Sequence, residues 1–294
     1  MPSLKEIRTR IASIKSTRQI TGAMKMVAAS RLRKVQNKII HLRSYEATLM
    51  SILKDVMLRL PPSYQNVYLR PRDNKDVLLI CLGSDKGLCG TYNTLLIKRT
   101  LDELKNLVES GANPSVMPVG KKTLSFFEKR EYDLCAAGDF KLDKVSGETA
   151  TEFAKHLVKL FFSQNYGRML VVYNRFRNAV VHEMTVEQVL PLHEDMLYKS
   201  LTDEEIPDDP IILEPEAEEV IDYLTQQYIH FNVYRILLDA SASEHGSRMT
   251  AMHQATDNAD QMLKTLTLSY NKARQASVTR ELLDIVGGGV QQTA

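Results

Sequence analysis

Two long stretches without proline, one at each end of the chain, constrain the fold more than any other feature. The first follows Ser3 and continues to Pro61, with apolar residues mostly at the 3-4 spacing of a helix that packs along one face. A helix over residues 3–58 would be about 84 Å long, whereas an average globular helix has about 11–12 residues. We therefore expect an equally long partner that covers its apolar stripe.

The second stretch supplies that partner. Pro215 suits the first turn of a helix, and the acidic residues that follow it suit the positive end of the helix dipole. Apolar residues keep heptad spacing up to Gly287–Gly289, where the sequence predicts the helix end. This helix, over residues 216–285, would be about 105 Å long. Because both helices flank the same middle segment, we expect an antiparallel coiled coil in which the C-terminal helix projects farther.

Residues 75–200 have a different sequence pattern, in which predicted strands alternate with predicted helices. The expected elements are strands at 77–82, 116–119, 169–173 and 180–189, an amphipathic helix at 95–108, and helices at 121–129 and 149–162. This alternation predicts an α/β layer structure with a largely parallel sheet. The expected division is an N-terminal helix at 1–60, an α/β domain at 75–200, an acidic linker at 201–215, and a C-terminal helix with its tip at 216–294.

Composition excludes several classes of protein. No run approaches 18 apolar residues, so no transmembrane helix is expected, and no targeting segment is visible at the N-terminus. Three cysteines without Cys-x-x-Cys spacing favour a reducing compartment and no zinc site. The net charge of +2 hides an asymmetry, because residues 1–60 hold thirteen Lys and Arg against three acidic residues, a net of +10.

The glycine-rich turn at 83–90 is the obvious candidate for phosphate binding. It matches neither the G-x-x-x-x-G-K-[ST] loop nor G-x-G-x-x-G, so a tight strand-to-helix turn is favoured. His182-Glu183 and His193-Glu194 lack the second histidine of a metalloprotease motif, and no metal site is expected. Cys89 is interpreted as a buried structural thiol.

The basic N-terminal helix leaves two interpretations open, a solvated flank or a positive surface that faces acidic protein partners. No aromatic residues interleave its cations for base stacking, which disfavours nucleic acid. Two other functions are weighed: a stand-alone α/β enzyme with an active-site loop at 84–90, and a coiled-coil nucleic-acid adaptor with steeply salt-dependent binding.

Several segments resemble one known family. They are IRTRIASI at 7–14, ITGAMKMVAAS at 20–30, SDKGLCG at 84–90, NKARQAS at 271–277 and TREL at 279–282. Together they resemble the gamma subunit of F-type ATP synthase, over essentially the whole chain. The resemblance implies an α/β fold with a long antiparallel coiled coil formed by the N- and C-terminal helices, and a central Rossmann-like α/β domain.

The resemblance also implies a function. Such a chain is a central-stalk rotor without catalytic residues, cofactor or metal of its own. It transmits torque between a proton-driven c-ring and a catalytic ring of three alpha and three beta subunits, with one copy per complex and the epsilon subunit as a neighbour. It implies a peripheral position on the cytoplasmic side of the bacterial plasma (inner) membrane.

Site residues carry over where the motif is present. Met24 and Lys25 match the segment that packs against the beta-subunit lever. Positions matching contacts with the alpha–beta hexamer are Arg248, Arg274, Gln275, Thr279 and Glu281. Glu214 resembles the acidic position facing the c-ring, although Ile211 and Ile212 replace the aromatic residues frequent there. The dithiol insertion of chloroplast members is missing, so redox gating is not expected.

Overall fold

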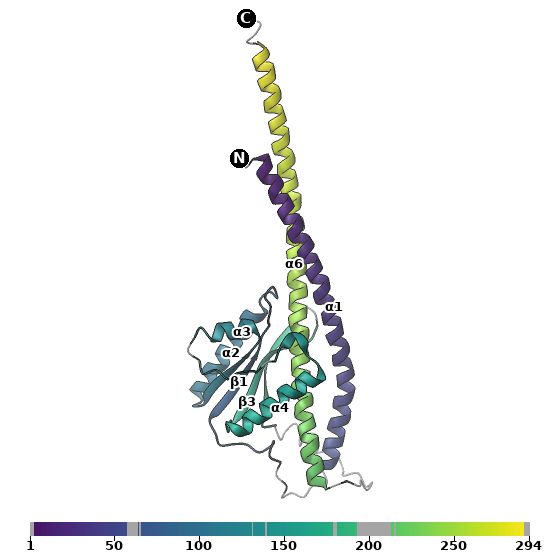
Figure 1. Ribbon diagram of the computed structural model, residues 1–294, viewed down its shortest axis with the longest axis vertical. Helices are drawn as coiled ribbons and strands as arrows, with labels where there is room; N and C mark the ends of the chain where they lie inside the picture. The colour runs from purple at the N-terminus through teal and green to yellow at the C-terminus, as the bar shows by residue number, and fades with distance from the viewer. Residues whose placement is uncertain are drawn as a thin grey trace. The chain divides into compact units, whose positions relative to one another are not determined.

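Two helices, of 54 and 74 residues, are the longest elements that the structure describes. In the computed structural model, α1 extends over Leu4–Met57 and α6 over Ala217–Val290 (Figure 1). The described residues are 3–57, 64, 66–130, 132–138, 140–178, 181–192, 213, 214 and 216–290. The chain divides into two units, one of Met1–Ala28 with Arg248–Ala294 and one of Ala29–Ser247.

The C-terminal helix end predicted at Gly287–Gly289 is wrong. Helix α6 continues through these glycines to Val290. Glycine lowers helix stability by about 1 kcal/mol relative to alanine but keeps the N–H that the helical hydrogen bond needs. Without a proline to remove that donor, a glycine run weakens a helix rather than ending it.

The unit of Ala29–Ser247 contains a four-stranded sheet. Its elements are β1 (Asp76–Leu82), α2 (Tyr92–Glu109), β2 (Asn113–Val119), α3 (Lys121–Phe127), a short 3₁₀ turn (Leu142–Lys144), α4 (Gly147–Ser163), β3 (Arg168–Phe176) and β4 (His182–Leu190). The strand order is β2-β1-β3-β4. Strands β2, β1 and β3 are parallel and β4 is antiparallel to β3, so the predicted α/β architecture is confirmed as a mixed sheet.

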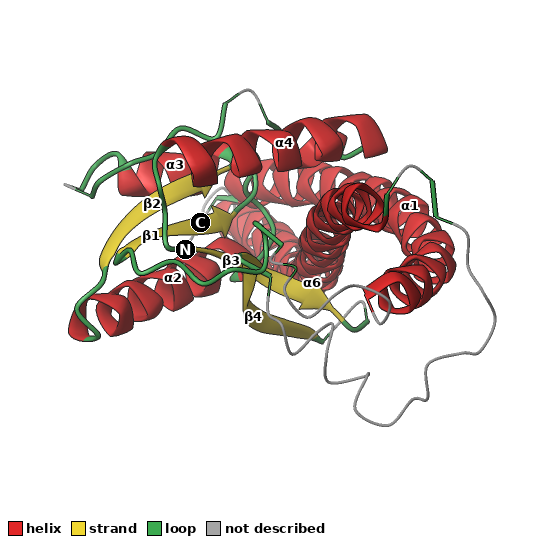
Figure 2. Ribbon diagram, turned by 90° about the horizontal axis from the view of Figure 1, so that it is seen from below, coloured by secondary structure: helices red, strands yellow, loops and turns green. Residues whose placement is uncertain are grey.

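The two faces of the sheet have different partners, and β1 shows how the sequence assigns them. Its alternate residues Leu78, Ile80 and Leu82 lie in a core with α4 and the parts of α1 and α6 that belong to this unit. The intervening residues, Val77, Leu79 and Cys81, pack with α2 and the end of α3. Helices α2 and α4 lie on opposite sides of the sheet in Figure 2. A strand that is apolar at every position is therefore buried on both faces.

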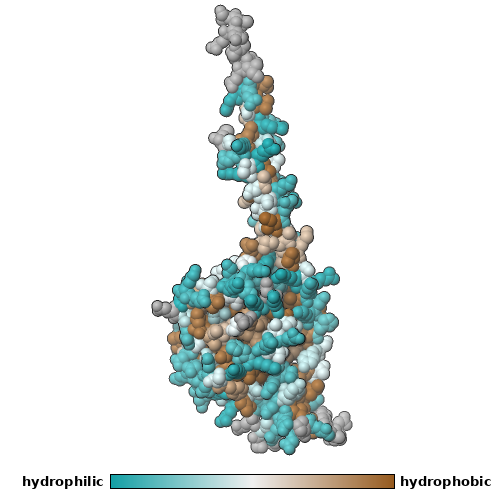
Figure 3. Space-filling view, viewed as in Figure 1, coloured by the Kyte–Doolittle hydropathy of each residue, from teal (hydrophilic) through white to brown (hydrophobic). Residues whose placement is uncertain are grey.

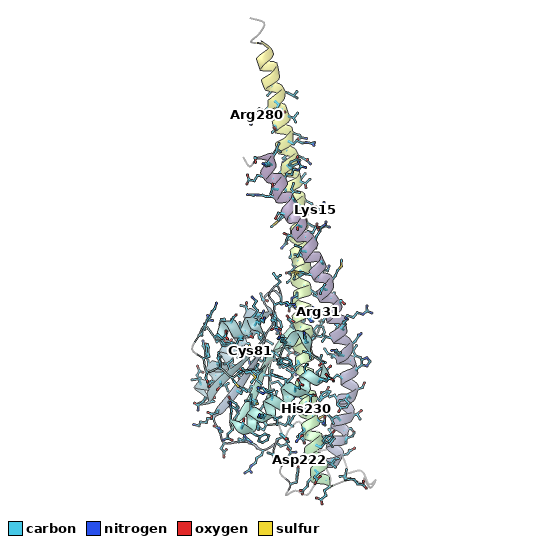
Figure 4. All side chains as sticks on the ribbon, viewed as in Figure 1. Lys15, Arg31, Cys81, Asp222, His230 and Arg280 are labelled. Carbon is cyan, nitrogen blue, oxygen red and sulfur yellow. The ribbon has the colours of Figure 1, made fainter. Side chains whose placement is uncertain are left out.

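The first turns of α6 are tied to the segment that precedes β1. Tyr64 donates a hydrogen bond to the Asp222 carboxylate at 2.5 Å, and Asn66 Nδ2 donates to Thr225 Oγ1 at 3.1 Å. Burial, followed by the Asp222 carboxylate, raises the pKa of Tyr64. Asp222, labelled in Figure 4, is thus held near the beginning of α6 by neutral donors.

The glycine-rich turn after β1 is explained by close backbone packing. A Cβ atom on Gly120, whose φ is +91°, would lie 2.4 Å from the Gly83 carbonyl oxygen. A Cβ atom on Gly83 would lie 2.2 Å from Thr123 Cγ2. Only glycine fits where the ends of β1 and β2 approach each other, so these glycines are accounted for without a ligand.

Gly120→Ala should lower the free energy of unfolding of the full chain by about 2–4 kcal/mol, because strained backbone and a steric clash add. Gly147→Ala is the matched control, since nothing lies within 4 Å of its added Cβ. That variant should change stability by about 0.5 kcal/mol or less. Urea denaturation followed by circular dichroism measures both, and a Gly120→Ala chain as stable as the control would contradict the packing argument.

Candidate functional site

The unit of Met1–Ala28 and Arg248–Ala294 is a pair of antiparallel helical segments. Arg18 Nε contacts Asp260 Oδ1 at 2.6 Å, and Thr256 donates a hydrogen bond to Thr21 at 2.9 Å. Lys25 Nζ lies 3.4 Å from His253 Nδ1. As the residue number rises on α1 it falls on α6, and the numbers of each pair add up to 277 or 278. The expected opposite direction of the two helices is therefore observed here.

This unit has almost no core. Of the side chains that the structure describes in it, the buried ones are Ile7, Thr21, Ala28, Arg248, Met252 and Ala259. Several of them are small or polar, which lets two helices lie close together but buries little apolar area. Two helices alone leave most of each surface in solvent.

Large apolar side chains are nevertheless exposed along the same unit. Met26 is 74% exposed and Leu283 is 65% exposed. The others are Ile20, Val27, Met262, Leu268, Val278 and Leu282. Brown patches interrupt the hydrophilic surface of these helices in Figure 3. Repeated apolar exposure on an element with so little core is typical of a surface that a protein partner covers.

The structure separates the predicted site residues into different environments. Met24 and Lys25 are half-buried on α1, and Lys25 is held by the contact with His253. Arg248 is buried. Glu214 is exposed and precedes α6, whereas 201–212 of the expected linker lies outside the described residues.

Arg274, Gln275, Thr279 and Glu281 are brought together near the C-terminal end of α6, all of them exposed. By the register of the helix pair, Leu4, the first residue of α1, lies opposite about position 274. The segment beyond that point, where Figure 4 labels Arg280, has no α1 residues beside it. Among its described side chains the polar contacts are local, such as Thr279 Oγ1 to the Gln275 carbonyl at 2.9 Å, so their remaining polar surface is available to a partner.

Side chains of the loop at 84–90 form hydrogen bonds within the loop and with Asn93 of α2. Ser84 Oγ donates to the Lys86 carbonyl at 2.8 Å, and Asn93 Nδ2 donates to Ser84 Oγ at 2.8 Å and to Cys89 Sγ at 3.2 Å. Burial raises the pKa of the neighbouring Cys81 thiol, labelled in Figure 4, to about 12. A nucleophile needs an adjacent base or a lowered pKa, whereas the partners in these hydrogen bonds are an amide and a backbone carbonyl, neither of which is a base.

Within the described ranges, no cluster of three or more His, Cys, Asp or Glu side chains could hold a metal ion. None of the helices described has a segment apolar and long enough to span a bilayer.

Sequence reasoning missed a polar cluster on the sheet. Arg235 of α6 contacts Glu187 of β4, and Tyr173 and Arg175 of β3 contact the same carboxylate. Burial alone would lower the pKa of Arg235, but the Glu187 charge and Tyr173 outweigh it and raise that pKa. The sequence carried one signal for this cluster, which is a glutamate, Glu187, at an inward position of a strand. A buried carboxylate needs a cationic partner.

Comparisons with known proteins agree over nearly the entire chain. The family model described as ATP synthase matches residues 3–290. The ATP synthase gamma chain of Christiangramia forsetii is 40% identical over 288 residues, which cover 98% of each chain. That of Flavobacterium johnsoniae is 39% identical over 290 residues, again 98% of each.

Solved structures give the same result. A chain of the central stalk and c-ring of the Tetrahymena thermophila mitochondrial ATP synthase superposes with a TM-score of 0.56 at 27% identity, covering 80% of this chain and 99% of that one. A chain of the Euglena gracilis mitochondrial enzyme shares the fold, with a TM-score of 0.66 at 19% identity and coverage of 98% and 94%. The chain therefore belongs to the ATP synthase gamma-chain family, and it is a non-catalytic subunit of the central stalk of an F-type ATP synthase.

Proposed function

We propose that the chain turns inside a ring of three alpha and three beta subunits, one copy per complex, and couples their ATP chemistry to proton flow through a c-ring. In this proposal residues 1–60 and 216–294 form a left-handed antiparallel coiled coil. The Rossmann-like domain at 75–200 binds the epsilon subunit, and the acidic linker at 201–215 lies near the c-ring.

The observation that carries the proposal is the apolar exposure of the helix pair. Side chains such as Met26 and Leu283 leave 74% and 65% of their surface exposed within the described residues of their own unit. Burying apolar surface is worth about 25 cal/mol per Å², so a ring that surrounds these helices gains stability from them. A stand-alone enzyme or a nucleic-acid adaptor has no use for this surface, and the comparisons favour neither.

Torque requires contacts that differ between the subunits of the ring. A rotor that interacted equally with all three beta subunits would shift no equilibrium among their conformations. The two-helix unit is unequal around its axis, since α1 and α6 bear different side chains and α6 alone continues beyond the start of α1. At any moment each beta subunit would therefore face a different surface.

Most of the residues assigned by resemblance fit this arrangement, whereas Arg248 is buried. Met24 and Lys25 are proposed to contact the beta-subunit lever, and Arg248 to belong to the same coupling surface. Arg274, Gln275, Thr279 and Glu281 are exposed near the end of α6 and are proposed to contact the ring there. Glu214, exposed just before α6, is proposed to face the c-ring.

The proposed location is the cytoplasmic side of a bacterial inner membrane, where the chain would be held peripherally by the complex. The curated relatives at 35–40% identity are bacterial gamma chains, among them those of Cytophaga hutchinsonii and Salinibacter ruber.

The proposal is tested by reconstituting the chain with alpha and beta subunits of its own organism and attaching a probe to the α/β unit. ATP should drive unidirectional rotation of the probe, and the chain alone should hydrolyse no ATP. ATP turnover by the chain alone, or tight DNA binding that weakens steeply with salt, would instead support one of the alternatives.

Met24→Lys should reduce the number of protons pumped per ATP in membrane vesicles while ATP hydrolysis continues. The reason is that it places a charge on a half-buried position that is proposed to pack on the beta-subunit lever. Gln19→Lys is the control, since it adds the same charge at an exposed polar position of α1. Equal coupling in wild type and Met24→Lys, or an equal loss in both variants, would count against the assignment.

A further inference from the structure

The family assignment leaves the polar cluster between α6 and the sheet without a role. One Glu187 oxygen contacts Arg235. The other accepts hydrogen bonds from Tyr173 at 2.7 Å and from Arg175 at 3.3 Å. The side chains of Arg235 and Glu187 are only 20% and 17% exposed. Two strands and one helix therefore meet at one largely buried carboxylate, that of Glu187.

Arg235 is itself held in place on α6. Its Nη2 donates to Asn232 Oδ1 at 2.6 Å, and its Nη1 lies 3.9 Å from Asp239 Oδ2. Asn232 is one turn before Arg235 and Asp239 one turn after it, so the guanidinium is fixed on both sides along the helix. A planar guanidinium fixed in this way donates its hydrogen bonds in defined directions, in addition to its charge interaction with the carboxylate.

A second contact joins the same elements farther along the helix. Ser243 Oγ donates to the backbone carbonyl of Asn174 at 2.8 Å, and both residues are buried. Asn174 lies between Tyr173 and Arg175 on β3. Strand β3 and helix α6 are thus connected at two levels about two turns apart.

Apolar packing and these polar contacts resist different movements. The core between α6 and the sheet consists of side chains such as Tyr228, Ile236 and Leu237, and apolar contacts are non-directional. A helix can rotate slightly about its axis on such a surface with little loss of buried area. Charge-assisted hydrogen bonds depend on angle, so they oppose that rotation.

We propose that Arg235, with Glu187 as its partner on β4, is the positioning residue that fixes the rotational setting of α6 against the sheet, so that helix and α/β domain turn as one body. This inference rests on the proposed rotor function. Neither residue would contact the ring or any nucleotide.

The test uses the full chain assembled with alpha and beta subunits on a surface, with Cys135→Ser as background. A bead is attached either to Lys105→Cys on α2 or to Tyr223→Cys on α6, both of which are exposed. The α6 bead reports the stiffness of the helix alone, and the α2 bead reports the helix and the joint together. The variance of bead angle during pauses measures each stiffness.

Arg235→Met should increase the angular variance of the α2 bead about twofold or more and leave that of the α6 bead unchanged, because only the angle-dependent contacts are lost. Arg235→Lys keeps the charge but not the planar fork, and should restore part of the stiffness. Glu187→Gln keeps size and an acceptor oxygen, and it decides the question if methionine prevents assembly.

The matched control is Arg177→Met with Glu183→Gln. This pair joins the end of β3 to β4 at 3.0 Å without involving α6, and its side chains are 60% and 53% exposed. It should leave both variances unchanged. The inference is overturned if a rotating Arg235→Met or Glu187→Gln complex matches wild type with the α2 bead, or if both beads loosen equally. Absence of rotation in the unmodified complex would instead contradict the proposed function.

Discussion

The structure depends on one constraint, which is that neither terminal helix can cover its apolar positions alone. Helix α1 has 54 residues and α6 has 74, and each needs a long partner in water. Since the two helices flank the same α/β segment, the partner available to each is the other, in the antiparallel direction. The pairs Arg18–Asp260 and Thr21–Thr256 show one register for both. Because α6 is longer than α1, this pairing also leaves the C-terminal end of α6 without α1 beside it.

The two units divide the mechanical work between them. The α/β unit buries apolar residues on both faces of its sheet and gains stability from its own core. The helix pair buries little and exposes Met26 and Leu283, so in the proposed function it would gain stability from the ring around it. A rotor needs this combination, because a part that is gripped by stationary subunits must still slide past them. Contacts that are weak singly and unequal around the axis meet that requirement.

The sequence predicted those parts of the fold that depend on local periodicity. The apolar run at 77–82 and the long proline-free stretches became β1, α1 and α6, with ends within two residues except at Gly287–Gly289. That error came from treating glycine as a stop, whereas a helix ends only if its hydrogen bonds do. The fit of Gly83 to Gly120 and the partnership of Glu187 with Arg235 depend on residues far apart in sequence, and no spacing rule reveals them. The site residues came from resemblance, since a surface recognised by shape carries no chemical motif.

The register of the two terminal helices is tested most directly by a disulfide between Thr21→Cys and Thr256→Cys, in a Cys135→Ser background. The two hydroxyl oxygens lie 2.9 Å apart, so mild oxidation of the native chain should link the pair rapidly. Thr21→Cys with Thr267→Cys, about three turns farther along α6, should stay reduced. Failure of the first pair to link, or equal linkage of both pairs, would show that the helices do not lie side by side in this register, and the account of the chain as a two-helix rotor would be contradicted.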